Sequence, residues 1–281
     1  MVWLMLAAGL AALYLVLICP VLSARGKEVF SSGMWYAHRG LHDDVVCENT
    51  LTAFERAAEY GWGIELDVRL TKDERLVVFH DDTLKRLCGL DDAIGDMTLD
   101  QVKAVRLPDG QGIPELEQVL QLVNGRIPLL VEIKSTKIGN CRVSEKLYEL
   151  LEGYGGSYTV QSFDPIQLRW FKKHAPGVIR GQLAQKARLQ KPFRLLRDLP
   201  QMMAGQLLFN RISSPDYVAY RQEDTKTFCY RLMRRVYHIP LAVWTVRSER
   251  EAEKMKGISD AIIFENFRPE IKGGKEHERN A

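Results

Sequence analysis

The sequence has few cysteines, and their spacing argues against two kinds of structural crosslink. Five occur in 281 residues, at positions 19, 47, 88, 141 and 229. No two of them stand in a C-x-x-C pair, so the pattern indicates neither a disulfide framework nor a structural zinc site. Scattered single thiols of this kind fit a reducing compartment.

The chain also lacks an excess of charge of either sign. It carries 39 basic and 36 acidic residues, which gives a formal net charge of +3. This balance argues against nucleic acid as a partner, because nucleic-acid-binding domains concentrate positive charge. The length suits one large core, and a single α/β barrel of about 250 residues has an ordinary size.

Long apolar runs are missing except at the amino terminus, where residues 1–22 contain no charged side chain. Such a run can cross a bilayer as a helix. A cleaved signal peptide would begin with basic residues, and a lipoprotein signal would have a small residue where Ile18 precedes Cys19. We therefore expect an uncleaved transmembrane anchor. Arg25 and Lys27 follow it, so the positive-inside rule places the rest of the chain in the cytoplasm.

Two acidic residues alternate with apolar residues in the middle of a predicted strand. Glu65 and Asp67 are separated by Leu66 and flanked by Ile64 and Val68. On an extended strand both carboxylates point to one face and the apolar side chains to the other. Two carboxylates on one strand face indicate a cation-binding site.

A short polar break follows this strand and predicts a hairpin turn. With Asp73 and Glu74 at the tip, antiparallel pairing places Asp67 directly opposite His80 on the same face. The hairpin would therefore bring an imidazole next to the acid pair.

A second imidazole and a guanidinium end another short apolar run, at His38 and Arg39. Because imidazole titrates near neutrality, His38 and His80 are candidates for a general acid and a general base. The planar guanidinium of Arg39 suits bidentate contact with phosphate, and a structural salt bridge to one of the acids is its alternative. Two carboxylates that can bind a metal ion, two histidines and an arginine together suit phosphoryl-transfer chemistry.

Farther along, strands and helices alternate, which indicates parallel β/α units. A buried strand over residues 127–134 brings Glu132, the third predicted metal ligand, to its carboxyl end, and Lys134 follows on the same face. The predicted strand ends are His38, Glu65, Glu132, Ser162, Gln182, Trp244 and Glu265, and residues 217–220 supply an eighth strand. We expect an α/β fold, a (β/α)8 TIM barrel with its site at the carboxyl ends of the strands.

The chain is thus divided into an anchor over residues 1–22, a linker over 23–33, the barrel over 34–270 and a polar tail over 271–281. Between residues 184 and 235 the barrel pattern is interrupted by alternating basic and apolar residues, among them Lys186, Arg188, Lys191, Arg194 and Arg197. A basic amphipathic helix there would suit anionic lipid headgroups. An ordinary barrel helix with a solvated face is the favoured interpretation.

Five motifs follow one another between positions 38 and 81: His38-Arg39-Gly40, Glu48-Asn49-Thr50, Ala53-Phe54, Glu65-Leu66-Asp67-Val68 and Val77-Val78-Phe79-His80-Asp81. This series resembles the glycerophosphodiester phosphodiesterase family, in particular bacterial members with an amino-terminal membrane segment. The resemblance implies a TIM barrel and a divalent ion, Mg²⁺ or Ca²⁺, on Glu65, Asp67 and Glu132. It implies catalysis by His38 and His80.

In that family the glycerol hydroxyl next to the phosphate attacks phosphorus, a cyclic phosphate forms, and water then opens it. The resemblance implies that the products are glycerol 3-phosphate and an alcohol. Arg39 and Lys134 would bind the phosphate, and Trp244 would line the glycerol pocket unless it is a core residue.

Two alternatives remain open. The same site could act on an intact phospholipid or a polyglycerolphosphate, or the chain could be an inactive membrane-anchored lipid-binding barrel. The inactive barrel predicts loss of catalytic groups, which are all present. The departures from the family pattern are Cys47 in place of proline, Arg247 in place of asparagine, and the ending Phe264–Pro269. They concern substrate choice more than the reaction.

Overall fold

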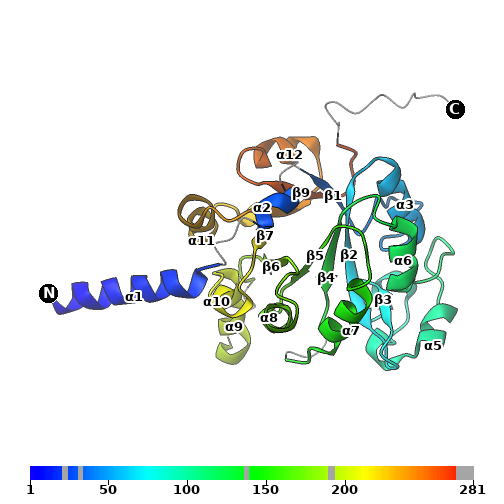
Figure 1. Ribbon diagram of the computed structural model, residues 1–281, viewed down its shortest axis with the longest axis horizontal. Coiled ribbons are helices and arrows are strands. Elements are labelled where there is room, and N and C mark those ends of the chain that lie inside the picture. Colours follow the sequence, from blue (N-terminus) through cyan, green and yellow to red (C-terminus); the bar gives the residue numbers. More distant parts are fainter. Residues whose placement is uncertain (21–24, 31–33, 136–138, 189–193, 270–281) are drawn as a thin grey trace.

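The computed structural model describes residues 1–20, 25–30, 34–135, 139–188 and 194–269. In these ranges eight parallel strands form a closed barrel with helices around it (Figure 1). The strands are β1 (Trp35–His38), β2 (Gly63–Leu70), β4 (Leu129–Ile133), β5 (Tyr158–Ser162), β6 (Arg180–Ala184), β7 (Tyr217–Arg221), β8 (Leu241–Val246) and β9 (Ala261–Phe264). Because β1 pairs with both β2 and β9, the barrel closes, and the predicted (β/α)8 architecture is confirmed.

Strand β3 (Leu76–Val78) is an additional arm that pairs antiparallel with β2, as the hairpin pattern predicts. The predicted register was wrong by one residue. Val68 lies opposite Val78, and the Phe79 N–H donates to the Asp67 carbonyl at 3.0 Å. Phe79, rather than His80, therefore lies opposite Asp67.

The loop of this hairpin explains the shift. The Thr71 N–H donates to the Arg75 carbonyl at 2.9 Å, which leaves residues 72–74 as the loop. Glu74 has a left-handed φ of 60°. A three-residue loop that ends in a left-handed residue moves the register by one relative to a two-residue turn.

Helices follow the strands around the outside. They include α3 (Leu51–Glu59), α5 (Leu99–Ala104), α6 (Leu116–Val123), α7 (Arg142–Leu151), α8 (Pro165–His174) and α12 (Glu249–Met255). The hydroxyl of Thr50 accepts from the Ala53 N–H, and that of Thr98 accepts from the Gln101 N–H. Both threonines therefore cap the first turn of their helices.

Two parts of the core hold the barrel in shape. One is formed by apolar residues between strands and helices, such as Leu66, Val131 and Phe171, and the other fills the interior around Tyr36 and Tyr217. Helix α2 (Arg25–Phe30) lies within the predicted linker and adds Phe30 to the interior cluster, where its ring meets the Tyr217 ring edge-on at 4.9 Å. Its Arg25 pairs with Asp216 at 2.9 Å.

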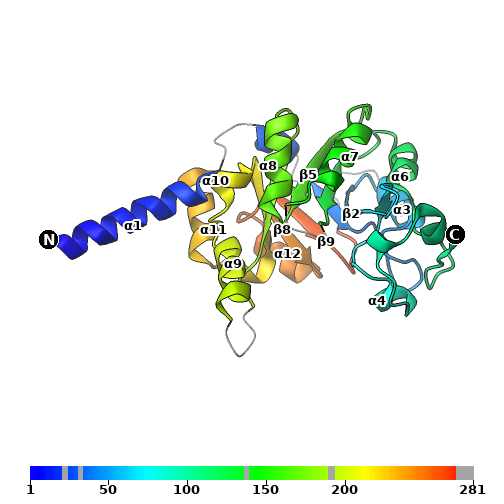
Figure 2. The ribbon, with the colours of Figure 1, turned by 90° about the horizontal axis from the view of Figure 1, so that it is seen from below.

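The apolar amino-terminal run forms α1 (Val2–Ile18), which projects from the barrel (Figure 2). The helix ends at Ile18 because Cys19, in an extended conformation, precedes Pro20. In the described part of the chain no helix combines the length and apolarity needed to cross a bilayer. The prediction of a transmembrane helix over residues 1–22 is therefore not supported.

The interrupting stretch between β6 and β8 contains several short helices instead of one long helix. They are α9 (Leu195–Gly205), α10 (Asn210–Ser213), η2 (Gln222–Asp224), α11 (Phe228–Leu232) and the π-helix η3 (Met233–Tyr237). Lys191 of the predicted basic pattern and the predicted tail over 271–281 lie outside the described residues. The smaller elements elsewhere are α4 (Lys85–Cys88) and η1 (Ile94–Asp96).

Candidate active site

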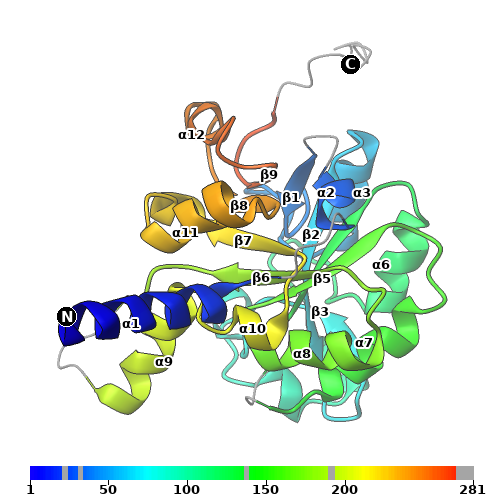
Figure 3. The ribbon, with the colours of Figure 1, turned by 60° about the vertical axis from the view of Figure 1, so that its left-hand side comes forward.

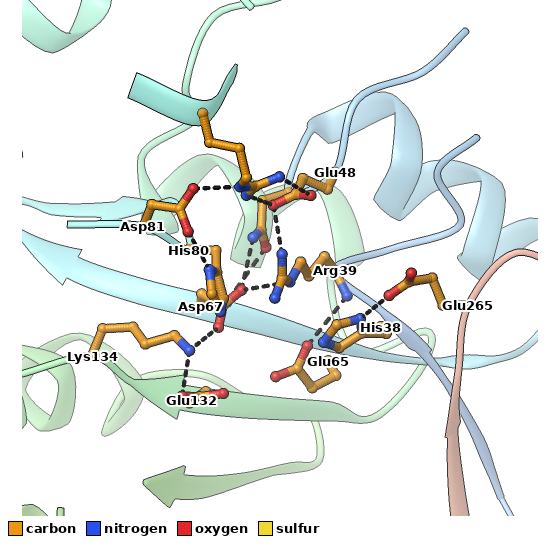
Figure 4. A network of polar contacts seen from close by, with 12 residues as sticks. His38, Arg39, Glu48, Glu65, Asp67, His80, Asp81, Glu132, Lys134 and Glu265 are labelled. Carbon is orange, nitrogen blue, oxygen red and sulfur yellow. Dashed lines mark hydrogen bonds and ion pairs between the residues drawn. The ribbon is translucent and has the colours of Figure 1, made fainter. Parts of the chain in front are cut away.

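Three neighbouring strands place the predicted acids side by side. In the parallel register His38 of β1 lies beside Glu65 of β2, and Asp67 of β2 lies beside Glu132 of β4. One carboxylate oxygen from each of Glu65, Asp67 and Glu132 lies within 4.8 Å of the others, and all three residues are buried. Figure 4 shows the trio beside His38 and the lysine that follows β4.

Two cations adjoin this acidic trio. The Lys134 Nζ atom lies 2.5 Å from Glu132 Oε1 and 3.1 Å from Asp67 Oδ1. The Arg39 Nε atom lies 3.5 Å from Asp67 Oδ2, and the Arg39 backbone N–H donates to Glu65 Oε2 at 3.2 Å. The guanidinium and the ammonium thus contact different oxygens of Asp67 and lie on opposite sides of it (Figure 4).

The charges in the trio depend on one another. Burial and the nearby charges of Asp67 and Glu132 raise the pKa of Glu65 well above its usual range. Burial also raises the pKa of Glu132. Burial alone would raise the pKa of Asp67, but Lys134 and Arg39 outweigh it and hold that pKa far below its usual range. Asp67 is therefore the carboxylate that is ionised most readily.

The donor set fits a hard divalent ion. It consists of carboxylate oxygens, and no cysteine belongs to the group that the described residues form. Asp67 Oδ1 is buried without a hydrogen bond from any described residue, although Lys134 Nζ is close to it. The Lys134 ammonium, 3.1 Å away, balances the charge of this buried oxygen. The side chain of Asn49 orients Asp67, because its Nδ2 donates to Oδ2 at 2.9 Å.

His38 is held by a carboxylate from the last strand region of the barrel. Its Nδ1 lies 2.5 Å from Glu265 Oε2, and Glu265 is also 3.3 Å from Arg247 Nε. Burial lowers the pKa of His38 to about 4. At neutral pH the imidazole is therefore neutral, with its Nδ1–H directed to Glu265 and Nε2 left as the basic atom.

His80 has the same kind of support on the other side of the site. Its Nδ1 lies 2.7 Å from Asp81 Oδ1, and Arg86 Nε donates to Asp81 Oδ2 at 2.6 Å. The backbone carbonyl of His80 accepts from Arg69 Nε at 3.0 Å. Burial lowers the pKa of His80 as well. His80 reaches the site after β3 has ended, not from a paired strand position.

Glu48 connects Arg39, the candidate phosphate-binding residue, to the residues that support His80. Its carboxylate accepts from Arg39 Nη1 at 2.8 Å and from Arg86 Nη2 at 2.6 Å. The same Arg86 holds Asp81, so one chain of charged hydrogen bonds runs from Arg39 to His80. Such a chain fixes the orientation of the groups at its two ends.

The structure brings together the predicted residues His38, Arg39, Glu65, Asp67, His80, Glu132 and Lys134. Trp244 stands apart in the described contacts, where its indole N–H donates to the Ala219 carbonyl at 3.1 Å and its ring meets Phe163 edge-on. Sequence reasoning missed Asp81, Arg86 and Glu265 as partners of the site. Asp81 could have been found from its position next to His80, whereas Glu265 required knowledge of barrel closure.

A closed parallel barrel that gathers buried carboxylates, imidazoles and a guanidinium at the carboxyl ends of its strands is typical of TIM-barrel enzymes. Residues 38–267 match the model of the glycerophosphoryl diester phosphodiesterase family. The chain therefore belongs to this family.

Known relatives agree with this assignment. A glycerophosphodiester phosphodiesterase of Caldanaerobacter subterraneus subsp. tengcongensis is 33% identical over 242 residues, which cover 82% of this chain and 93% of the relative. The glycerophosphodiester phosphodiesterase structure from Thermotoga maritima is 27% identical with a TM-score of 0.64, and covers 82% of this chain and 93% of that one. The structure of an Oleispira antarctica phosphodiesterase with the product sn-glycerol 3-phosphate has a TM-score of 0.69 at 20% identity, and covers 82% and 92% of the two chains. At that identity it supports the fold alone.

Proposed function

We propose that this chain hydrolyses glycerophosphodiesters to glycerol 3-phosphate and an alcohol. The observation that carries the proposal is the meeting of the acidic trio, two carboxylate-supported histidines and Arg39 at one edge of the barrel. Membership of the family supports the same reaction.

The histidines divide the proton transfers between them. Both Nδ1 atoms are engaged by carboxylates, so both Nε2 atoms are left for exchange with substrate. One imidazole, in its neutral form, accepts the proton of the glycerol hydroxyl as its oxygen attacks phosphorus, and the other, which enters the step as the imidazolium, gives its Nε2 proton to the alcohol that leaves. The two exchange roles when water opens the cyclic phosphate. Glu265 and Asp81 stabilise whichever imidazolium is formed.

The two cationic side chains bind the phosphate, and the acidic trio would hold a metal ion beside it. Arg39 and Lys134 bind its oxygens and orient the ester for attack. A divalent ion, Mg²⁺ or Ca²⁺, held by Glu65, Asp67 and Glu132 would offset the negative charge of the phosphoryl oxygens. Trp244 is proposed as a wall of the glycerol pocket, through its ring and not through its indole N–H.

The direct test is a panel of glycerophosphodiesters incubated with the purified full chain, with release of glycerol 3-phosphate as the readout. His38→Ala and His80→Ala should each lower kcat by about 10²- to 10⁴-fold, which is the usual contribution of a general acid or base. Lys173→Ala, on the exposed side of α8, is the control and should leave kcat unchanged. Full activity in His38→Ala would contradict the mechanism.

We propose in addition that α1 attaches the chain to a membrane. The large apolar side chains from Met1 to Leu6 are exposed. The carboxyl end of α1 is held by the barrel, because Asn210 Nδ2 donates to the Ile18 carbonyl at 2.9 Å. An apolar helix segment that no described residue covers suits a lipid environment. Leu6→Glu with Leu10→Glu should move the protein from the membrane fraction to the supernatant, and unchanged fractionation would contradict the attachment.

The proposed position of the barrel is cytoplasmic, on the basis of the two basic residues after α1. A reporter fused after Ala281 tests it. If a reporter that functions only outside the cell is active at this position, the proposed cytoplasmic position of the barrel is wrong.

A further inference from the structure

A basic groove lies on the barrel surface between α11, η3 and α12. Its volume is about 920 Å³. The charged residues that line it are Lys226, Arg231, Arg234, Arg235 and Lys254 on the basic side, and Glu223 and Glu251 on the acidic side.

Among the described residues neither acid forms an ion pair with these cations, and the five basic side chains outnumber the two acids. Glu223 accepts from Arg221 Nε at 2.7 Å, and Glu251 accepts from Gln222 Nε2 at 2.8 Å. Within the described part of the chain, Arg231 and Arg235 are exposed and form no ion pair. The groove is therefore a positively charged concavity that remains available to an anion.

Exposed apolar side chains border the groove on the elements that supply its arginines. Phe228 of α11 is 60% exposed, and Val236 of η3 is 55% exposed. The same two elements hold α1, since Tyr14 stacks on Phe228 with ring centroids 6.2 Å apart and the Tyr237 hydroxyl donates to the Leu15 carbonyl at 2.6 Å. The groove and the apolar helix thus share α11 and η3 as neighbours.

Helix α9 extends this surface. Its outward residues Leu195, Leu196, Leu199 and Met202 are all exposed, with Leu196 at 93%. The Tyr14 hydroxyl donates to Gln206 at the end of α9 over 3.4 Å, so α9 is joined to α1 (Figure 3). We call the surface formed by α1, α9, α11 and η3 the basic–apolar face.

We propose that the basic–apolar face docks on a bilayer that contains anionic phospholipids, with the phosphate of a headgroup in the groove. Such a bilayer offers negative phosphates beside an apolar layer, which matches exposed arginines beside exposed leucines. An acidic protein or nucleic acid would match the arginines only and would leave the apolar residues in water. The inference rests on the proposed membrane attachment and is independent of the proposed hydrolysis.

The test measures cosedimentation of the full chain with vesicles of phosphatidylcholine alone or of phosphatidylcholine with phosphatidylglycerol. The wild type should bind the anionic vesicles more tightly, and this preference should fall at high salt. Arg231→Ala with Arg235→Ala should weaken binding to the anionic vesicles by about tenfold and leave binding to neutral vesicles unchanged. Lys72→Ala with Arg106→Ala removes the same amount of charge and should retain the wild-type preference. The Lys72 N–H donates to the Met97 carbonyl just before α5, and Arg106 follows α5. Helix α5 lies on the other side of the barrel from α11 (Figure 1).

Each outcome has a separate meaning. Equal binding of the wild type to both vesicle types would overturn the headgroup site and leave attachment through α1 intact. No binding to either would overturn both. A lipid-free dimer that dissociates in the Arg231→Ala and Arg235→Ala variant would assign the face to a second copy of the chain. Hydrolysis of a soluble glycerophosphodiester, followed in parallel, should be the same in all variants and shows that they are folded.

Discussion

At the scale of single residues, the two proposed catalytic histidines are supported in the same way. Nδ1 of His38 is bound to Glu265, and Nδ1 of His80 is bound to Asp81. Each carboxylate is in turn paired with an arginine, Arg247 for one and Arg86 for the other. A carboxylate on Nδ1 fixes the tautomer and leaves Nε2 for proton transfer. The two imidazoles are thus matched for roles that they exchange between the two steps.

This support can be tested at Glu265. Glu265→Gln keeps the size of the side chain but removes the negative charge that stabilises the His38 imidazolium. We expect kcat to fall by about 10²-fold while KM changes little, because the lost interaction is made when the proton moves. Steady-state kinetics on one glycerophosphodiester measure both constants. A raised KM with unchanged kcat would instead show that Glu265 contributes to substrate binding.

The burial of His38 also has a consequence for stability. Its pKa is about 4 in the folded chain, because burial disfavours the imidazolium, and its reference value is 6.5. Between these values the unfolded chain binds more protons, so this group makes the free energy of unfolding fall as the pH falls from 6.5 to 4. His38→Gln removes this titrating group. Between pH 6.5 and pH 4 its free energy of unfolding should therefore fall less than that of the wild type, with a difference on the order of 2 kcal/mol. Urea unfolding in metal-free buffer measures the difference, and parallel pH profiles would contradict it.

Single residues also show how far the sequence could predict the site. Glu65 and Asp67 were predictable because two acids in alternation with Ile64, Leu66 and Val68 must share a strand face. The partners of the histidines were not predictable in this way. A hydrogen bond between His38 and Glu265 joins positions 227 residues apart, and nothing local in the sequence connects them.

At the scale of elements, the hairpin of β2 and β3 shows a limit of pattern reading. The apolar alternation predicted both arms, but register depends on the conformation of the loop. Glu74 adopts the left-handed φ that is usual for glycine or asparagine, so its residue type gave no sign of a three-residue loop. The strand pair was therefore predictable and its register was not.

The fit of strands β6 and β7 makes a sharper prediction. Gly181 lies beside Tyr217 in the parallel register, and a Cβ atom on Gly181 would lie 2.1 Å from the Tyr217 ring. Because that ring is buried in the barrel interior, Gly181→Ala should lower the free energy of unfolding by about 1–3 kcal/mol or more. Gly177→Ala is the matched control, since a Cβ there meets no atom within 4 Å. Equal denaturation midpoints for the two variants would contradict this account of the interior.

At the scale of the whole molecule, barrel closure explains why the site draws on both ends of the domain. Strand β1 pairs with β2 on one side and with β9 on the other. His38 at the end of β1 therefore lies between Glu65 of β2 and Glu265, which follows β9. The fold class was predictable from the alternation of strands and helices, whereas this particular adjacency follows only from closure.

The central claim is that the acidic trio, with a divalent ion, and the two histidines form one phosphodiesterase site. The most direct measurement is the rate of glycerol 3-phosphate release from a glycerophosphodiester before chelation, after chelation, and after return of Mg²⁺ or Ca²⁺. We expect the chelator to abolish release and one of the ions to restore it, and Glu132→Gln to weaken that restoration because it removes one of three buried carboxylates. Unchanged release in the presence of the chelator would contradict the claim.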